Sequence, residues 1–176
     1  MQTKPAYRIR EAIPSDLEEM LQMRGRLQDH FADSDERVLP LSPKSMADAR
    51  ALYTRRIEST AVSCAVAEHT ATGTLVGMAI GSIHPPEGPV RSPSGHIDDV
   101  WVEPAHRHNG LCRALTRYVT VFFLERGLEQ VGLSYLFANE KAARTWTRLG
   151  FVPFNVSAYA GTRALLDQLD GPNGGT

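Results

Sequence analysis

Apolar positions along the chain fall into strand-like and helix-like patterns that alternate with polar segments. Alternation or short apolar runs predict strands at residues 7–10, 61–68, 74–83, 97–102 and 131–137. Apolar residues at helical spacing predict helices over residues 15–31, 42–57, 111–126 and 139–149. Because strands and helices are interspersed along one chain, the pattern predicts an α/β (α+β) fold.

Several helix ends carry recognisable signals. Ser15 and Glu18 have the spacing of a capping box, in which the two side chains bond to the first backbone N–H groups. Pro43 suits the first position of a helix, because its missing N–H would have no partner there. Gly127 suits the end of the third helix.

Two long segments read as irregular loops. Asp29 to Leu41 is polar and acidic, and His84 to Gly95 carries four prolines and two glycines in twelve positions. After the fourth helix, residues 150–157 could add a strand, whereas residues 162–169 have the spacing of a helix. Residues 171–176 are expected to be a disordered end.

Composition narrows the class of protein. The 176 residues suit one domain spanning 1–176, and a net charge of −1 gives no general reason to expect a nucleic-acid or membrane partner. The sequence has no long apolar run or leader-like start, and Cys64 and Cys112 suit neither a disulfide framework nor a metal site. We therefore expect a cytoplasmic protein, and the sequence leaves a homodimer open.

A turn between the fourth strand and the third helix is the best candidate for ligand binding. It reads Arg107-His108-Asn109-Gly110-Leu111-Cys112. Unpaired N–H groups at the start of a helix converge on anions, and the helix dipole adds to the attraction. Gly110 would let a negative group approach the backbone closely.

This turn and a second motif, Asn139 to Phe151, together resemble the Gcn5-related N-acetyltransferase (GNAT) family. The second motif has Asn-x-x-Ala, an aromatic residue seven positions after the Asn, and Leu-Gly-Phe, whereas Cys112 departs from the first motif. The resemblance implies a mixed, mostly antiparallel sheet of six or seven strands flanked by about four helices. It also implies acetyl-coenzyme A (acetyl-CoA) as co-substrate. The residues implied to bind it are Val100, Trp101, Val102, Arg107, His108, Asn109, Gly110, Leu111, Cys112, Asn139 and Trp146.

The side chain that accepts the proton of the acceptor amine is less well defined. Strand alternation places His96, Asp98 and Val100 on one face and Ile97, Asp99 and Trp101 on the other, although a bulge would change this. His96 lies where related enzymes carry a catalytic Glu or His, so it is the candidate base, with Asp98 orienting it. A pair of polar residues at a solvated strand end is an equally good interpretation.

The donor of a proton to the departing thiolate is also open. Many relatives carry a Tyr where this chain has Trp146, which has no acidic proton, so Tyr135 is a candidate substitute, although a core role suits it better. His106 and His108 have no third ligand nearby, and the sequence predicts no metal. The expected acceptor is a small-molecule or peptide amine, and the alternative function is non-catalytic acyl-CoA binding or sensing.

Overall fold

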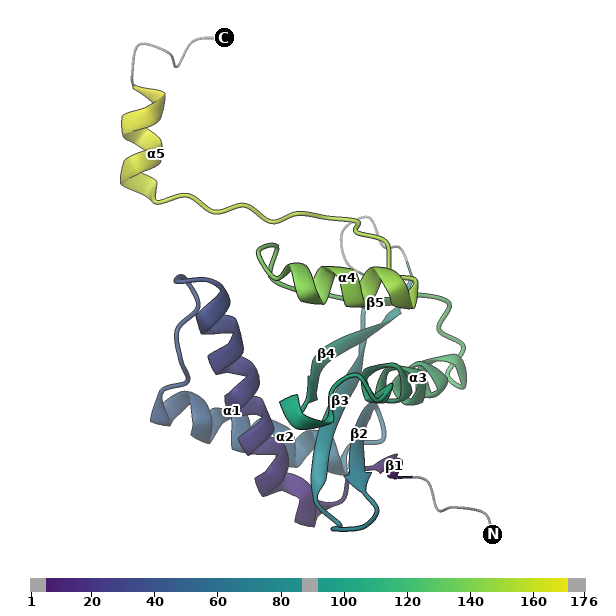
Figure 1. Ribbon diagram of the computed structural model, residues 1–176. Helices are drawn as coiled ribbons and strands as arrows, with labels where there is room; N and C mark the ends of the chain where they lie inside the picture. The colour runs from purple at the N-terminus through teal and green to yellow at the C-terminus, as the bar shows by residue number, and fades with distance from the viewer. Residues whose placement is uncertain (1–5, 87–91, 171–176) are drawn as a thin grey trace.

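The computed structural model describes residues 6–86 and 92–170 and contains a five-stranded sheet in the order β1-β2-β3-β4-β5 (Figure 1). The first four strands are antiparallel neighbours, and β5 pairs with β4 in parallel. The strands are β1 (Tyr7–Glu11), β2 (Val62–His69), β3 (Leu75–His84), β4 (Ser94–Val102) and β5 (Val131–Leu133).

Helices cover both faces of the sheet. α1 and α2 lie on one face and α3 on the other, while α5 points away from the rest of the chain (Figure 1). The helices are α1 (Leu17–Ser34), α2 (Pro43–Glu58), α3 (Leu111–Leu124), α4 (Glu140–Leu149) and α5 (Thr162–Leu169), with short 3-10 turns at Pro14–Asp16 and Pro104–His106. The sheet therefore separates two apolar clusters.

The cluster under α3 is closely packed. Phe123 and Val119 are fully buried against the sheet, and any Cβ placed at Gly81 or Gly95 would overlap their side chains. Glycines at these two positions let α3 sit close to β3 and β4. A Cβ at Gly77 would likewise lie 3.2 Å from Leu115, so the first half of α3, which follows the turn from Arg107 to Cys112, also packs close to the sheet.

Most predicted elements are confirmed, and the differences lie at their ends. α1 continues to Ser34, so the loop predicted from Asp29 begins only at Asp35. The Ser15 capping box is wrong: Asp16 instead accepts the Ile13 N–H at 2.8 Å, and Glu18 pairs with Arg50 on α2. Ser42 does cap α2, accepting the Ser45 N–H at 3.1 Å.

The C-terminal third differs most from the expected fold. β5 ends at Leu133 instead of residue 137, and no strand forms over 150–161, so the described sheet has five strands rather than six or seven. The helix predicted over 162–169 is confirmed as α5, and the predicted disordered end lies outside the described residues. The segment from Val152 to Leu169 is exposed throughout, and the side chains of Val152 and Tyr159 are both 84% exposed.

An ion pair between β1 and the start of α1 supports a stability prediction. Asp16 is 6% exposed and accepts two bonds from the Arg10 guanidinium, at 2.6 and 3.0 Å. Burial alone would raise the pKa of Asp16, but the bonds from Arg10 and from the Ile13 N–H outweigh it and hold the pKa below its usual range. We expect Asp16→Asn to lower the free energy of unfolding by about 2 kcal/mol at neutral pH.

The pH dependence of that loss follows from the direction of the pKa shift. A lowered folded-state pKa stabilises the protein above the unfolded pKa, and this stability is lost as the pH falls through the folded value. Urea titrations of parent and variant should therefore differ most at neutral pH and converge in strong acid. An unchanged difference across that range would contradict the assignment.

Candidate active site

The sheet opens between β4 and β5. The two strands pair only from Gly95 to Ile97 on β4, and β4 then continues to Val102 without β5 beside it. At the same point β4 carries a bulge, because Ile97 pairs with Gly81 and Asp99 with Ile80, leaving Asp98 without an opposite residue. A bulge bends its strand and increases the local twist. The bend explains why β5 is shorter than its apolar sequence predicts.

Beyond the bulge, β4 presents to this opening backbone amides that have no partner among the described residues. Glu103 donates its N–H to Val76 of β3 at 2.9 Å. Because N–H groups alternate sides along a strand, the Trp101 amide also faces β3, whereas those of Val100 and Val102 face away from it. Two backbone donors thus point to the side from which β5 has departed.

The turn before α3 has the backbone of an anion site. His108 and Gly110 both adopt left-handed conformations, with φ of 66° and 77°, and they bracket Asn109. Within the described chain, no acceptor lies against the backbone N–H groups of residues 108–112. Unsatisfied amides at the N-terminus of a long apolar helix attract anionic groups.

Side chains of the turn hold its shape. The Arg107 Nε donates to the Val102 carbonyl at 2.9 Å, and its guanidinium carbon lies 4.9 Å from the centre of the Trp101 ring. The Asn109 amide donates to the carbonyls of His106 and Arg107, both at 3.2 Å. Arg107 therefore anchors the turn to the end of β4, which places the anion site next to the free amides of that strand.

His96 and Asp98 lie together as predicted. The His96 Nδ1 is 3.0 Å from the Asp98 Oδ1, while the Asp98 Oδ2 accepts bonds from Ser82 and Arg56, both at 2.8 Å. Burial would raise the pKa of Asp98, but the bonds from His96 and Ser82 and the charge of Arg56 keep it lowered, so the carboxylate stays ionised.

The predicted division of β4 into two faces is wrong beyond Ile97. Ile97 and Val100 pack in the cluster under α3, whereas Trp101 packs in the cluster under α1 and α2. Arg56 of α2 contacts both Asp98, at 2.8 Å, and Asp99, at 3.6 Å. The extra residue at the bulge shifts the alternation by one, so both carboxylates lie on the α2 side.

Sequence reasoning missed the neighbours of these carboxylates. Ser82 and His84 come from β3, and the His84 ring stacks on His96 with centroids 4.6 Å apart. Asp99 accepts a bond at 2.8 Å from Tyr53, which is buried in α2. Burial and the charge of Asp99 raise the pKa of the Tyr53 hydroxyl. Only the pairing register of β3 and β4 could have revealed Ser82 opposite His96, and the loop between them hides that register.

The second motif forms α4, the helix that follows β5 along the chain (Figure 1). Asn139 caps it by accepting the Ala142 N–H at 3.0 Å. Trp146 is half-buried, with its ring 5.7 Å from Phe151. Tyr135 lies beyond the end of β5, half-buried, instead of inside the strand.

Neither cysteine is suited to act as a nucleophile. Burial raises the pKa of the Cys64 thiol to about 12, with the charge of Glu11 adding to the effect. Burial likewise raises the pKa of the Cys112 thiol. Since the thiolate is the reactive form, a covalent acyl-cysteine is disfavoured at both positions.

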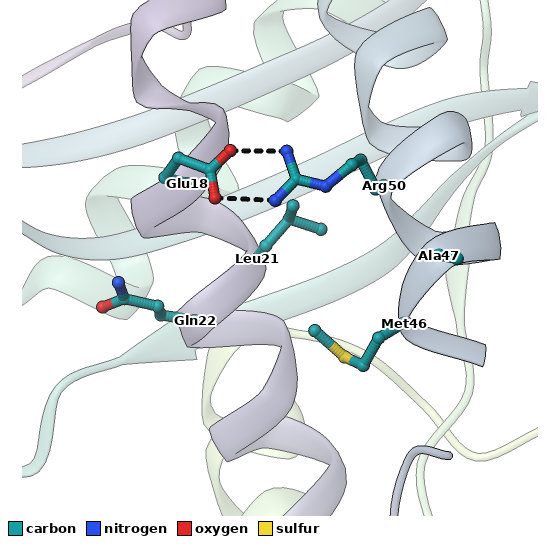
Figure 2. A pocket seen from close by; sticks show the side chains of 6 residues that line it. All are labelled: Glu18, Leu21, Gln22, Met46, Ala47 and Arg50. Carbon is teal, nitrogen blue, oxygen red and sulfur yellow. Dashed lines mark hydrogen bonds and ion pairs between the residues drawn. The ribbon is translucent and has the colours of Figure 1, made fainter. Parts of the chain in front are cut away.

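A separate cavity of about 330 Å³ lies between α1 and α2 (Figure 2). Arg50 and Glu18 form a two-bond ion pair across it, and the other lining residues are Leu21, Gln22, Met46 and Ala47. The cavity contains none of the predicted site residues. In the described residues, no helix is long and apolar enough to cross a membrane.

Sequence comparison matches residues 26–151 to the model of the acetyltransferase (GNAT) family. The glucosamine 6-phosphate N-acetyltransferase of Trypanosoma brucei brucei is 31% identical over 137 residues, which are 78% of this chain and 83% of that protein. The mycothiol acetyltransferase of Thermobispora bispora is 38% identical over 84 residues. That segment is 48% of this chain but 28% of the relative.

Solved structures show the same fold. AAC(6')-Iy, in complex with the bisubstrate analogue CoA-S-monomethyl-acetylneamine, superimposes with a TM-score of 0.71 at 19% identity, covering 89% of this chain and 98% of that one. At such identity the likeness shows the fold alone. Together with the family match over most of the chain and the similarity to the trypanosomal enzyme, it establishes that the chain belongs to the GNAT family of acetyltransferases.

Proposed function

We propose that this GNAT protein transfers the acetyl group of acetyl-CoA directly to a primary amine, without a covalent acyl-enzyme. The proposal rests on two sets of backbone amides that lie next to each other. The unpaired amides of the turn lie next to the outward-facing amides of β4, because Arg107 bonds to Val102. An anion site beside oxyanion donors suits a thioester linked to a pyrophosphate.

Each part of this site has a specific role in the proposal. The amides of residues 108–112 hold the pyrophosphate, and Val100 or Val102 donates to the thioester oxygen, where negative charge develops during attack. Asn139 and Trp146 on α4 flank the pantetheine arm. A fixed geometry of this kind lowers the entropic part of the barrier, and backbone donors need no reorganisation during the reaction.

His96 is the proposed base. The contact with Asp98 fixes its Nδ1, which leaves Nε2 as the atom that takes the amine proton, directly or through water. Asp98 is itself held by Ser82 and Arg56, so the imidazole is oriented through a chain of bonds. Tyr135 remains the proposed donor of a proton to the thiolate of coenzyme A.

Free thiol release distinguishes an enzyme from a sensor of acyl-CoA. The protein is incubated with acetyl-CoA and a panel of amines. The panel contains glucosamine 6-phosphate, neamine, a peptide with a free N-terminus, and Nα-acetyl-lysine, whose side-chain amine is free. These compounds sample the acceptors named for the relatives and the two other amine classes. We expect amine-dependent thiol release with at least one of them. Tight acetyl-CoA binding without any release would favour the sensing function.

We also propose that the acidic end of α1 and the loop after it attract the acceptor. This region carries exposed Asp33 and Glu36, and His30 places the end of α1 beside β4 by packing edge-on against Trp101 at 6.2 Å. We expect Asp33→Asn combined with Glu36→Gln to raise the acceptor KM by roughly two- to fivefold, because removing exposed charges weakens attraction of a cation only modestly.

Steady-state kinetics at two salt concentrations, together with calorimetry of acetyl-CoA, test this prediction. The acetyl-CoA affinity and kcat should stay unchanged, and the KM difference should shrink at high salt. Asp167→Asn on α5, which projects away from the sheet, is the control and should leave all three constants as they are (Figure 1). A weakened acetyl-CoA affinity with an unchanged acceptor KM would contradict the proposal that this region attracts the acceptor.

A further inference from the structure

The carboxylate of Asp98 lies between two histidines that belong to different strands. Its Oδ1 is 3.0 Å from the His96 Nδ1 and 3.7 Å from the His84 Nε2. One ligand-type atom from each of the three residues lies within 4.8 Å of the other two. All three side chains are partly accessible, with exposures of 38% for His84, 26% for His96 and 14% for Asp98.

These separations are close to those of a zinc site. A tetrahedral Zn²⁺ ion with bonds of about 2.0–2.1 Å holds its ligand atoms roughly 3.3 Å apart. The two distances to Asp98 bracket that value, and the His84 Nε2 would exchange its contact with the Ser82 Oγ, at 3.1 Å, for the ion. Two imidazoles and one carboxylate favour zinc over the hard ions magnesium and calcium, which prefer oxygen ligands.

The surroundings of Asp98 also suit a metal ligand. Its second oxygen, Oδ2, is held by Ser82 and Arg56, so Oδ1 is oriented toward the histidines. Bonds of this kind orient a metal ligand in the same way. The positive charge of Arg56 opposes a cation and leads us to expect reversible binding.

We propose that His84, His96 and Asp98 form a Zn²⁺ site whose occupancy inhibits acetyl transfer. The inhibitory part rests on the proposed function, since a metal bound to His96 and Asp98 would occupy the base and the carboxylate that orients it. Because the ion would bind the His96 Nδ1, the proton of the neutral imidazole would lie on Nε2, which could then no longer accept a proton from the amine. Three protein ligands leave the fourth position on the ion for water. The ion acts as a regulator of the site and takes no part in the reaction.

Calorimetric titration of the chelator-treated protein with zinc chloride tests the site without any assay of activity. We expect one ion per chain, and at least tenfold weaker binding in His84→Ala and in His96→Ala. His69→Ala is the matched control. It removes a histidine from the other close pair, His69 and His106, whose ring centroids are 5.6 Å apart, and should leave the affinity within twofold.

Cobalt(II) titration adds a spectroscopic readout, because a site with nitrogen and oxygen ligands gives visible absorption bands that His84→Ala should lose. Zinc binding that is unchanged in both His84→Ala and His96→Ala, or that disappears in His69→Ala, would overturn the site. Zinc binding at the cluster without loss of thiol release would overturn its inhibitory role. Failure to bind zinc would leave the acetyl-transfer proposal intact.

Discussion

Replacing Gly110 with aspartate should weaken acetyl-CoA binding at least a hundredfold. Gly110 caps α3 in a left-handed conformation and stands among amides that have no acceptor in the described chain. A carboxylate there would fill the anion site and repel the pyrophosphate at close range. Calorimetry of acetyl-CoA against parent and variant measures the loss directly.

Gly110→Asn separates charge from conformation. No heavy atom lies within 4 Å of a Cβ at this position, so both side chains fit, and asparagine tolerates left-handed backbone comparatively well. We expect the neutral variant to bind acetyl-CoA much more tightly than the charged one. Gly73→Asp lies at a left-handed turn between β2 and β3 and controls for the stability that is lost when aspartate replaces glycine in this conformation. This variant should bind acetyl-CoA as tightly as the parent. Equal losses in both Gly110 variants would contradict an electrostatic role.

His96→Gln should lower kcat/KM by about 10²-fold or more for strongly basic amines, which is the usual range for removing a general base. An amine of pKa ~10.4 is about one thousandth free base near neutral pH, a cost of ~4 kcal/mol, so it depends most on a base. For amines of pKa near ~8 we expect a much smaller loss. Kinetics with a series of amines in chelator-treated buffer would show this graded dependence.

Glutamine keeps the polarity and much of the size of His96, so the fold should survive. His69→Gln, at the end of β2, is the matched histidine control and should behave as the parent. A uniform loss for all amines would indicate a structural role for His96. Rates equal to the parent across the series would assign proton removal to water or another group.

Local signals along the chain predicted the parts of the site that depend on backbone. The turn from Arg107 to Cys112 joins one strand to one helix, so its amides are determined by neighbouring residues alone, and the structure forms it as expected. His96 and Asp98 are two residues apart on one strand, and their contact at 3.0 Å was predictable for the same reason.

Features that depend on strand register could not be predicted. The bulge at Asp98 exists because β3 and β4 pair with one extra residue in β4, and nothing in the alternation of either strand reveals it. The same difficulty hid Ser82 and His84, which reach Asp98 only through that pairing. β5 was predicted too long because an apolar run, such as residues 131–137, does not show where its neighbour turns away.

The bulge also constrains how this site can change during evolution or design. The bulge at Asp98 keeps His96 and Trp101 on the same side of the sheet, although five positions separate them along the strand. Point substitutions alter the side chains at these positions but leave the alternation untouched. Deletion of Asp98 itself would remove the bulge and leave His96 and Trp101 four positions apart, so both would stay on the same side of the sheet. Deletion of a different residue between them, with the bulge kept, would turn His96 to the opposite side from Trp101 while the start of α3 kept its place. The number of residues in β4 therefore sets the placement of the base relative to the cofactor, and insertions or deletions within this strand would change that placement.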